Sequence, residues 1–315
     1  MDQSATCLRS SRVPSILRRS PISKFAIIEA PSILGLKPTG VDTLPDALIS
    51  AGLADRLRAR CAGRVEPRTP YDGVRDSKTL ILNPHGIAAY SLQLADAVSR
   101  VLDRGEFPVV LGGDCSILLG DMLALNRRGR YGLLFIDGHA DFYQPEASPT
   151  GEAAEMDLAF ATGRGPEILT NFEGRWPLVR DADVVIFGYR DAEEQGRYGS
   201  QPLPPELVAI DLAEVRRRGA EGAARDAVAH LTREGGPQGG FWIHLDADAL
   251  DDAIMPAVDY RIPDGLSWDE LGTVLRIAMR SGRAVGLEIT IYNPKLDPEG
   301  ASGRGLAATV GSSLG

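Results

Sequence analysis

Short apolar runs alternate along this chain with longer segments in which apolar residues recur every three or four positions. The runs have the length and composition of buried strands, and they lie at 24–29, 107–111, 132–137, 183–187, 206–210, 241–246 and 284–289. The longer segments have helical periodicity, and they lie at 87–102, 117–125, 220–233 and 268–280. Ser267 and Glu270 fit a capping box at the start of the last segment. Strands that alternate with helices predict an α/β fold with a doubly wound, mostly parallel sheet.

No linker rich in proline and glycine divides the 315 residues, so we expect one domain over residues 22–315. Before it, residues 1–21 combine arginines and serines with a single acidic residue. This composition predicts a disordered tail, with an organellar transit peptide as the alternative.

The charge and the cysteines exclude several classes of protein. A net charge of −9 gives no basic surface for nucleic acid, and no stretch reaches the apolar length of a membrane span. Cys7, Cys61 and Cys115 resemble no disulfide framework, which favours a reducing compartment. The sequence therefore predicts a cytoplasmic protein that binds neither nucleic acid nor membranes.

Two groups of acidic residues and histidines lie at the ends of predicted strands. The first contains Asp137, His139 and Asp141, and the second contains His244, Asp246 and Asp248. Alternate residues of a strand face the same side, and the carboxyl ends of parallel strands meet at one edge of the sheet. Several carboxylates at one edge repel each other unless cations lie between them. The pattern therefore predicts a site for two metal ions.

A third group joins a predicted strand to a predicted helix through Gly112, Gly113, Asp114, Cys115 and Ser116. Two glycines permit a tight turn, and a thiol at a helix N-terminus is biased toward the thiolate. Cys115 is therefore a candidate for a reactive thiolate. The alternative is a small buried residue that only packs, since free cysteine is among the most buried residue types.

The order of these motifs resembles that of the ureohydrolase superfamily, which contains arginases, agmatinases and formimidoylglutamases. Its motifs G-G-D-H-S, D-A-H-x-D, S-x-D-x-D-x-x-D-P and E-x-N-P correspond to residues 112–116, 137–141, 244–252 and 291–294. The resemblance implies a three-layer α/β/α fold of the arginase type. It also implies a homo-oligomer, a trimer or hexamer, and two divalent ions, with manganese as the first expectation.

The resemblance assigns a role to each ligand. Asp137 and Asp246 bridge the two ions, Cys115 and Asp141 hold one ion, and His139 and Asp248 hold the other. Asp141 also orients the hydroxide that attacks an amidine or guanidine carbon. The substrate is then a small molecule with a linear C–N bond.

Two of these positions depart from the superfamily. Cys115 stands where the superfamily has a histidine. A thiolate adds negative charge, and its soft sulfur favours zinc, iron or cobalt, so we expect the ion beside Cys115 to be weakly held when manganese is supplied. His244 replaces a serine, and we expect it to donate a hydrogen bond to a ligand carboxylate. An added metal ligand and a packed core histidine are the alternatives for His244.

Ile291 stands where arginases and agmatinases place the glutamate that pairs with the guanidinium. Without that carboxylate, a cationic guanidinium loses charge-assisted hydrogen bonds. We therefore expect a substrate less basic than arginine, such as an N-hydroxyguanidine or an uncharged amidine. The alternative is that Glu193 or Glu288 supplies a carboxylate from elsewhere.

The substrate-side loops complete the expected site. By resemblance, the residues expected to contact the substrate are Tyr143, Thr150, Asp191 and Glu193. The loop histidine that is proposed to move protons in the superfamily corresponds to Ala154. We expect Glu155 to be catalytic in its place, with Glu152 as the alternative. A solvated loop carboxylate without a catalytic role is the other interpretation of each glutamate.

Together these features predict a metal-dependent hydrolase of a linear amidine or guanidine with a substrate other than arginine. The alternative is a catalytically weak protein of the same fold that binds a small molecule or a partner subunit. A third hypothesis, in which Cys115 is a nucleophile, does not use the two acidic groups.

Overall fold

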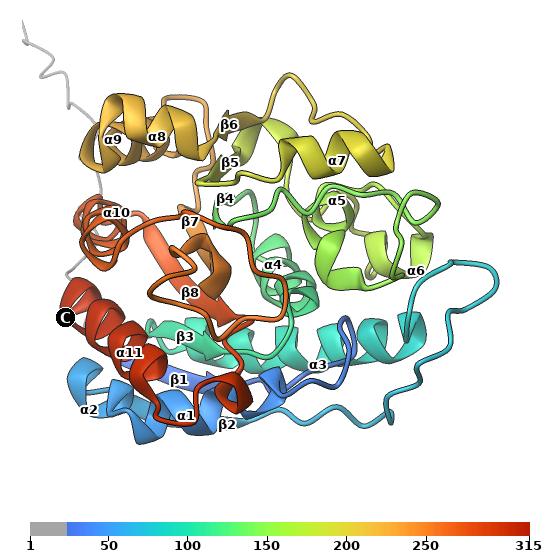
Figure 1. Ribbon diagram of the computed structural model, residues 1–315, viewed down its shortest axis with the longest axis horizontal. Coiled ribbons are helices and arrows are strands. Elements are labelled where there is room, and N and C mark those ends of the chain that lie inside the picture. The colour runs from blue at the N-terminus through green and yellow to red at the C-terminus, as the bar shows by residue number, and fades with distance from the viewer. Residues whose placement is uncertain (1–23) are drawn as a thin grey trace, which may run out of the picture.

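The computed structural model describes residues 24–315. Its centre is an eight-stranded sheet, in which every pair of neighbouring strands is parallel (Figure 1). The strand order is β2-β1-β3-β8-β7-β4-β5-β6. The strands are β1 Phe25–Glu29, β2 Arg60–Arg64, β3 Phe107–Leu111, β4 Gly132–Ile136, β5 Val184–Phe187, β6 Val208–Ile210, β7 Phe241–Asp246 and β8 Ala284–Thr290. The tail expected at residues 1–21 lies outside the described residues.

Helices cover both faces of the sheet and give three layers. One face carries α1 Leu44–Ser50, α2 Leu53–Leu57, α8 Leu212–Arg218, α9 Ala220–Leu231, α10 Trp268–Arg280 and α11 Ala301–Leu314. The other carries α3 Pro84–Asp103, α4 Leu118–Asn126, α5 Asp157–Ala161 and α6 Glu167–Thr170. In Figure 1 the sheet runs from β2 at the bottom to β6 at the top, between these two sets. A further helix, α7 Ala192–Tyr198, follows β5 and buries no residue.

The two apolar cores follow from the alternation of side chains along the strands. In β4, Leu134 and Ile136 pack into the core on the α9–α11 side, whereas Leu133 and Phe135 pack into the core on the α3–α5 side. The α/β architecture with a parallel sheet is confirmed.

All seven predicted strands and all four predicted helices are present, and the capping box of Ser267 and Glu270 forms with both of its hydrogen bonds. The sequence did not predict β2, an edge strand with a largely exposed surface and no apolar run. It also missed α11, in which glycines and serines interrupt the apolar positions. None of the helices within residues 24–315 has both the length and the hydropathy that a membrane span requires.

Candidate metal centre

The strands β3, β8, β7 and β4 are neighbours in the sheet, so the segments that leave their carboxyl ends lie side by side. The segment after β3 turns at Gly113, where an added Cβ would lie 1.7 Å from the carbonyl oxygen of Ser32. No other residue type fits this turn without moving the backbone. Asp114 then accepts hydrogen bonds from the Ser116 amide at 2.9 Å and the Ser32 hydroxyl at 3.0 Å. These contacts fix Cys115 at the start of a 3₁₀ turn.

One group of candidate ligands consists of Asp137, His139 and Asp248, whose ligand atoms lie within 4.8 Å of one another. His139 Nδ1 is 2.9 Å from Asp248 Oδ2 and 3.7 Å from Asp137 Oδ1. Asp137 also accepts a hydrogen bond of 2.7 Å from the His139 amide, which holds the turn after β4. The structure therefore brings together the three residues that the motifs suggested for this half of the site.

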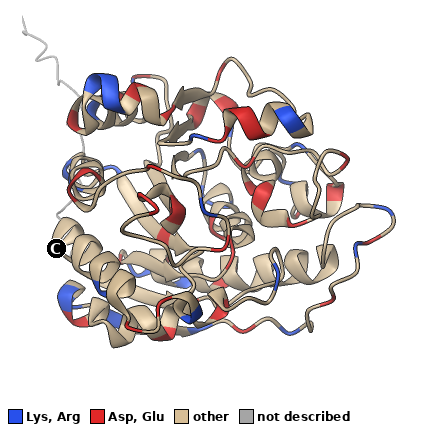
Figure 2. Ribbon diagram, viewed as in Figure 1, with Lys and Arg blue, Asp and Glu red and all other residues tan. Residues whose placement is uncertain are grey.

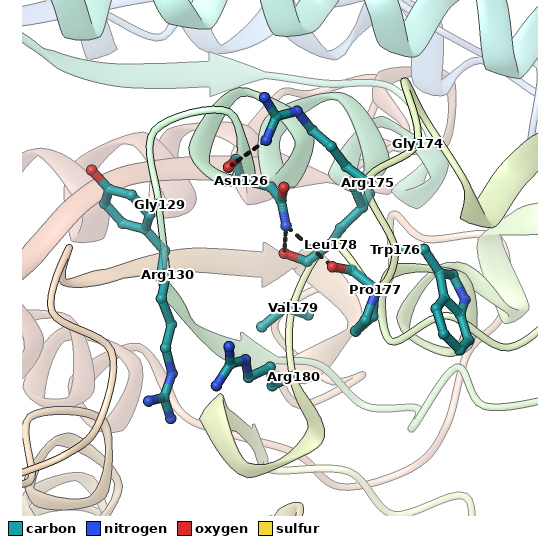
Figure 3. Close-up of a pocket in the computed structure, with 11 residues that line it drawn as sticks. Asn126, Gly129, Arg130, Gly174, Arg175, Trp176, Pro177, Leu178, Val179 and Arg180 are labelled. Carbon is teal, nitrogen blue, oxygen red and sulfur yellow. Dashed lines mark hydrogen bonds between the residues drawn. The ribbon is translucent and has the colours of Figure 1, made fainter.

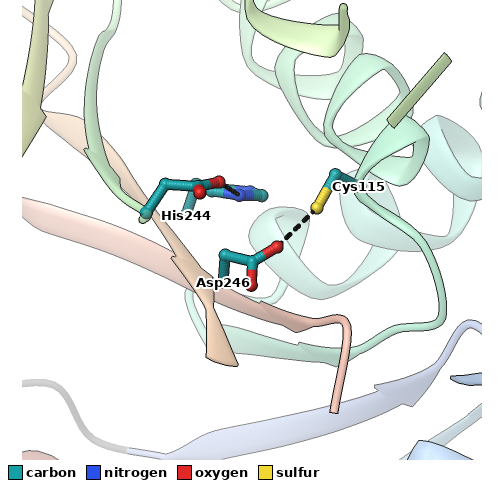
Figure 4. A group of neighbouring side chains, drawn as sticks. Cys115, His244 and Asp246 are labelled. Carbon is teal, nitrogen blue, oxygen red and sulfur yellow. Dashed lines mark hydrogen bonds and ion pairs between the residues drawn. The ribbon is translucent and has the colours of Figure 1, made fainter. Parts of the chain in front are cut away.

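A second group shares Asp137 and adds Cys115, His244 and Asp246, all four of them buried. Figure 4 shows the Cys115 thiol directed at the Asp246 carboxylate, and Sγ donates to Oδ2 at 2.9 Å. His244 Nε2 lies 3.5 Å from Asp137 Oδ2, and neither atom has a hydrogen-bond partner among the described residues. Of the six ligands expected from the sequence, this group and the first contain five.

Asp141 is the expected ligand that neither group contains. It has a left-handed backbone, with φ at 46°, and its carboxyl interacts with the buried Asp157. Burial, together with the charges of Asp137 and the other nearby carboxylates, raises the pKa of Asp141 well above its usual range. Asp141 still lines the cavity above the ligands.

The structure contradicts the expectation that the Cys115 thiol is biased toward the thiolate. Burial raises its pKa well above the usual value, and the charges of Asp246 and Asp157 raise it further. Proximity to a helix N-terminus therefore does not make Cys115 a thiolate in the metal-free protein. A coordinated cation would deprotonate the thiol.

The charges of the site fit divalent cations. Burial works to raise the pKa of Asp137, but His139 and His244 bring it below its ordinary value. Burial and the charge of Asp248 raise the pKa of Asp246 well above normal. Oxygen, nitrogen and sulfur donors with unpartnered buried atoms are a suitable ligand set for two ions that share a carboxylate. Figure 2 shows this acidic segment after β7 in the middle of the view.

A cavity of about 320 Å³ opens above the two groups. Its lining includes three residues that the sequence proposed for substrate or catalysis, namely Tyr143, Thr150 and Glu155. It also includes Ala154 and Ile291, at the positions where the resemblance expects a histidine and a glutamate. The lining of this cavity is therefore apolar at positions 154 and 291.

Glu155 is held in this wall by hydroxyl groups. Thr150 Oγ1 donates to Glu155 Oε1 at 2.7 Å, and Ser148 Oγ donates to the same oxygen. Burial raises the pKa of Glu155 above its ordinary value, although the two hydroxyls oppose that shift. The other candidate, Glu152, accepts a hydrogen bond of 2.7 Å from the Tyr260 hydroxyl and pairs with Lys37 at 3.4 Å. Both hydroxyls bind the same oxygen of Glu155, and no residue within 24–315 forms an ion pair with this carboxylate, in contrast to Glu152.

Helix α7 presents a different glutamate from the one expected. The Glu193 side chain is 92% exposed and pairs with Arg197, whereas Glu194 lines the cavity. Asp191 is buried and accepts a hydrogen bond of 2.8 Å from Gln195, and it is not part of the cavity lining.

Glu288 does not replace the missing glutamate either. The side chain is fully buried in β8, where Oε1 lies 2.9 Å from His244 Nδ1, on the side of the ring away from the candidate ligands. Strand β8 ends at Thr290, and Ile291 turns into the cavity with φ at 68°. Glu288, Asp121 and Asp157 form a buried acidic layer behind the ligands that the sequence interpretation missed. The available signal was an isolated aspartate, Asp121, in an otherwise apolar helix.

A second cavity, of about 430 Å³, lies beside the loop that precedes β4 (Figure 3). Its lining includes Arg130, Arg175, Trp176 and Arg180. It lies at the amino end of β4, whereas Asp137 follows the carboxyl end, and it contains none of the expected site residues. The chemistry suggested by the sequence therefore belongs to the cavity above the ligands.

Comparisons with known proteins agree with this geometry. The sequence model of the Arginase family matches residues 23–315. An arginase from Bacillus caldovelox is 30% identical over 304 residues, covering 92% of this chain and 98% of the relative, and one from Brevibacillus brevis is 29% identical over 298 residues, covering 92% and 97%. The solved structure of Bacillus caldovelox arginase superposes with a TM-score of 0.82 at 27% identity, covering 93% of this chain and 98% of that chain. The chain therefore belongs to the arginase family.

Proposed function

We propose that this protein hydrolyses a C–N bond of a linear guanidine or amidine that is less basic than arginine, such as an N-hydroxyguanidine. The observation that carries the proposal is the cavity in which Ile291 and Ala154 face the same space as the two ligand groups. The ligand groups favour ureohydrolase chemistry. The two apolar positions argue against arginine as the substrate.

Two divalent ions held by such groups supply Lewis-acid activation of water at neutral pH. The ligands of the proposed pair are the five expected residues that the groups contain, Cys115, Asp137, His139, Asp246 and Asp248. We keep manganese as the first candidate, with zinc, iron or cobalt favoured at the position of the Cys115 sulfur.

The remaining residues of the cavity have separate tasks in the proposal. Asp141 accepts a hydrogen bond from the attacking water and so orients it toward the substrate carbon. Glu155, whose pKa burial raises, accepts or returns a proton near the leaving nitrogen. Tyr143 and Thr150 contact the rest of the substrate, and Glu194 takes the position that the sequence suggested for Glu193.

The absence of a carboxylate at position 291 supports the proposed substrate class. A guanidinium that enters the cavity meets the Ile291 side chain where a charged partner is needed, and part of its hydration is lost without replacement. An N-hydroxyguanidine is less basic and enters more readily as the neutral form. This difference favours the neutral substrate over arginine.

The test compares hydrolysis of N-hydroxy-arginine, arginine, agmatine and formimidoylglutamate by protein loaded separately with manganese, zinc, iron and cobalt. We expect the highest kcat/KM for N-hydroxy-arginine, and loss of activity after chelation. An Asp137→Asn variant is the matched control, because it removes the carboxylate common to both ligand groups. Equal or faster hydrolysis of arginine would contradict the substrate proposal, and no turnover with any metal would favour a binding protein instead.

A further inference from the structure

His244 occupies the centre of a row of side chains that crosses three strands. The strand register pairs His244 with Phe135 of β4 on one side and with Glu288 of β8 on the other. The imidazole stacks on the Phe135 ring, with centroids 4.3 Å apart and planes 7° apart. Its Nδ1 lies 2.9 Å from Glu288 Oε1, which also accepts a hydrogen bond from Trp242 Nε1 at 3.3 Å. The ring is therefore held in one orientation from both sides.

This orientation directs Nε2 at the ligand group that contains Cys115. The nitrogen is fully buried, has no hydrogen-bond partner among residues 24–315, and lies 3.5 Å from Asp137 Oδ2. The ligand atoms of Cys115, Asp137, His244 and Asp246 all lie within 4.8 Å of one another. Ligands of a tetrahedral ion at about 2.0–2.3 Å lie roughly 3 to 4 Å apart, so the spacing suits a cation.

The contact at Nδ1 fits a metal-binding role for His244. Coordination of a cation at Nε2 requires that the ring hydrogen be on Nδ1, and Glu288 Oε1, 2.9 Å from Nδ1, can accept it. A cation at Nε2 would then take the place of the proton that an imidazolium holds between His244 and Asp137. The hydrogen-bond donor role expected from the sequence requires an imidazolium in the place where the cation binds. A carboxylate, a histidine and a metal ion in line form a recurrent arrangement in metal sites.

We propose that His244 Nε2 is a metal ligand, together with Cys115, Asp137 and Asp246, and that Glu288 orients it from behind. The imidazole that the superfamily supplies from the position of Cys115 reaches the same ion here from strand β7. This inference rests on the proposed function, because it concerns one of the two ions that the function uses.

Metal content and cobalt spectra of four proteins test the assignment. After equilibration with cobalt, we expect two ions per chain in the original protein and a thiolate-to-cobalt charge-transfer band from Cys115. His244→Ser should bind the ion beside Cys115 at least 100-fold more weakly and lose that band. His139→Ser should lose the other ion and keep the band. His85→Ser, which changes an exposed histidine, should keep both ions.

X-ray absorption on the original protein, loaded with two zinc ions, gives a measurement that does not depend on folding of a variant. Coordination by both His139 and His244 gives an average of one imidazole per zinc, whereas coordination by His139 alone gives one half. Two tightly bound ions in His244→Ser, or an average of one half imidazole, would overturn the assignment. A chain with this metal coordination but no activity on any amidine would refute the proposed function and leave the role of His244 intact.

Discussion

The substitution Ile291→Glu should increase the activity of the protein toward arginine. Ile291 is 5% exposed, lines the cavity, and adopts a left-handed backbone with φ at 68°. A carboxylate at this position offers a guanidinium charge-assisted hydrogen bonds, each contributing about 1.5–3 kcal/mol. Because about 1.4 kcal/mol corresponds to a factor of ten, we expect kcat/KM for arginine to rise roughly 10- to 150-fold.

The same substitution should lower stability. Loss of the buried isoleucine side chain costs about 1.5–3 kcal/mol. Glutamate is also a non-glycine residue, so the left-handed backbone at position 291 keeps its cost and offsets none of this loss. We therefore expect the free energy of unfolding to fall by about 1.5–3 kcal/mol.

The assay measures kcat/KM for arginine and for N-hydroxy-arginine with metal-loaded protein, alongside metal content and melting temperature. Ile291→Gln is the matched control, because it has the same length without the charge and should not improve arginine hydrolysis. If Ile291→Glu folds and retains its metals but leaves the preference between the two substrates unchanged, the account of substrate selection is wrong.

Three further predictions concern the proton, the metals and the scaffold. Since burial raises the pKa of Glu155, kcat/KM should fall as the pH is lowered through a value above the usual 4.5 of a glutamate. Glu155→Gln should remove this acidic fall of the pH profile and lower the rate at neutral pH by about 10²–10⁴-fold. An unchanged pH profile in this variant would exclude Glu155 as the group that moves the proton. Addition of metal at 100 times its Kd should stabilise the chelated protein by about 2.7 kcal/mol, or roughly 5 °C in Tm, and an unchanged calorimetric Tm would contradict a folded-state metal site. Asp183 is fully buried between Arg130 and Arg233. Asp183→Ala should therefore lower the free energy of unfolding, measured by urea titration, by about 3 kcal/mol without changing the metal content. A loss under about 1 kcal/mol would show that solvent screens these ion pairs.

Local patterns in the sequence predicted most of the fold and most of the candidate ligands that the structure brings together. The strands of the sheet centre are continuous apolar runs because helices cover both faces, and such runs stand out in a sequence. Asp137 and Asp246 could be predicted because a polar residue at the end of a buried strand must meet other strand ends at the same edge. Edge strand β2 lacks that signal, since its exposed residues are not selected for apolarity.

The details of the site depend on geometry that no local pattern carries. Helix α7 places Glu194 rather than Glu193 at the cavity, and a rotation by one residue about the helix axis determines this choice. The partner of His244 is Glu288, 44 residues away, and the register of two parallel strands determines that pairing. Burial and the charges of Asp246 and Asp157 raise the pKa of Cys115, and neither its burial nor these neighbours are visible in the sequence.

The central claim is metal-dependent hydrolysis of a substrate less basic than arginine. The most direct test assays one metal-loaded preparation in parallel with N-hydroxy-arginine and arginine, before and after chelation. The ligand groups around Asp137 and the apolar wall at Ile291 predict hydrolysis that depends on metal and a higher kcat/KM for N-hydroxy-arginine. Hydrolysis that survives chelation, or a preference for arginine, would contradict the account.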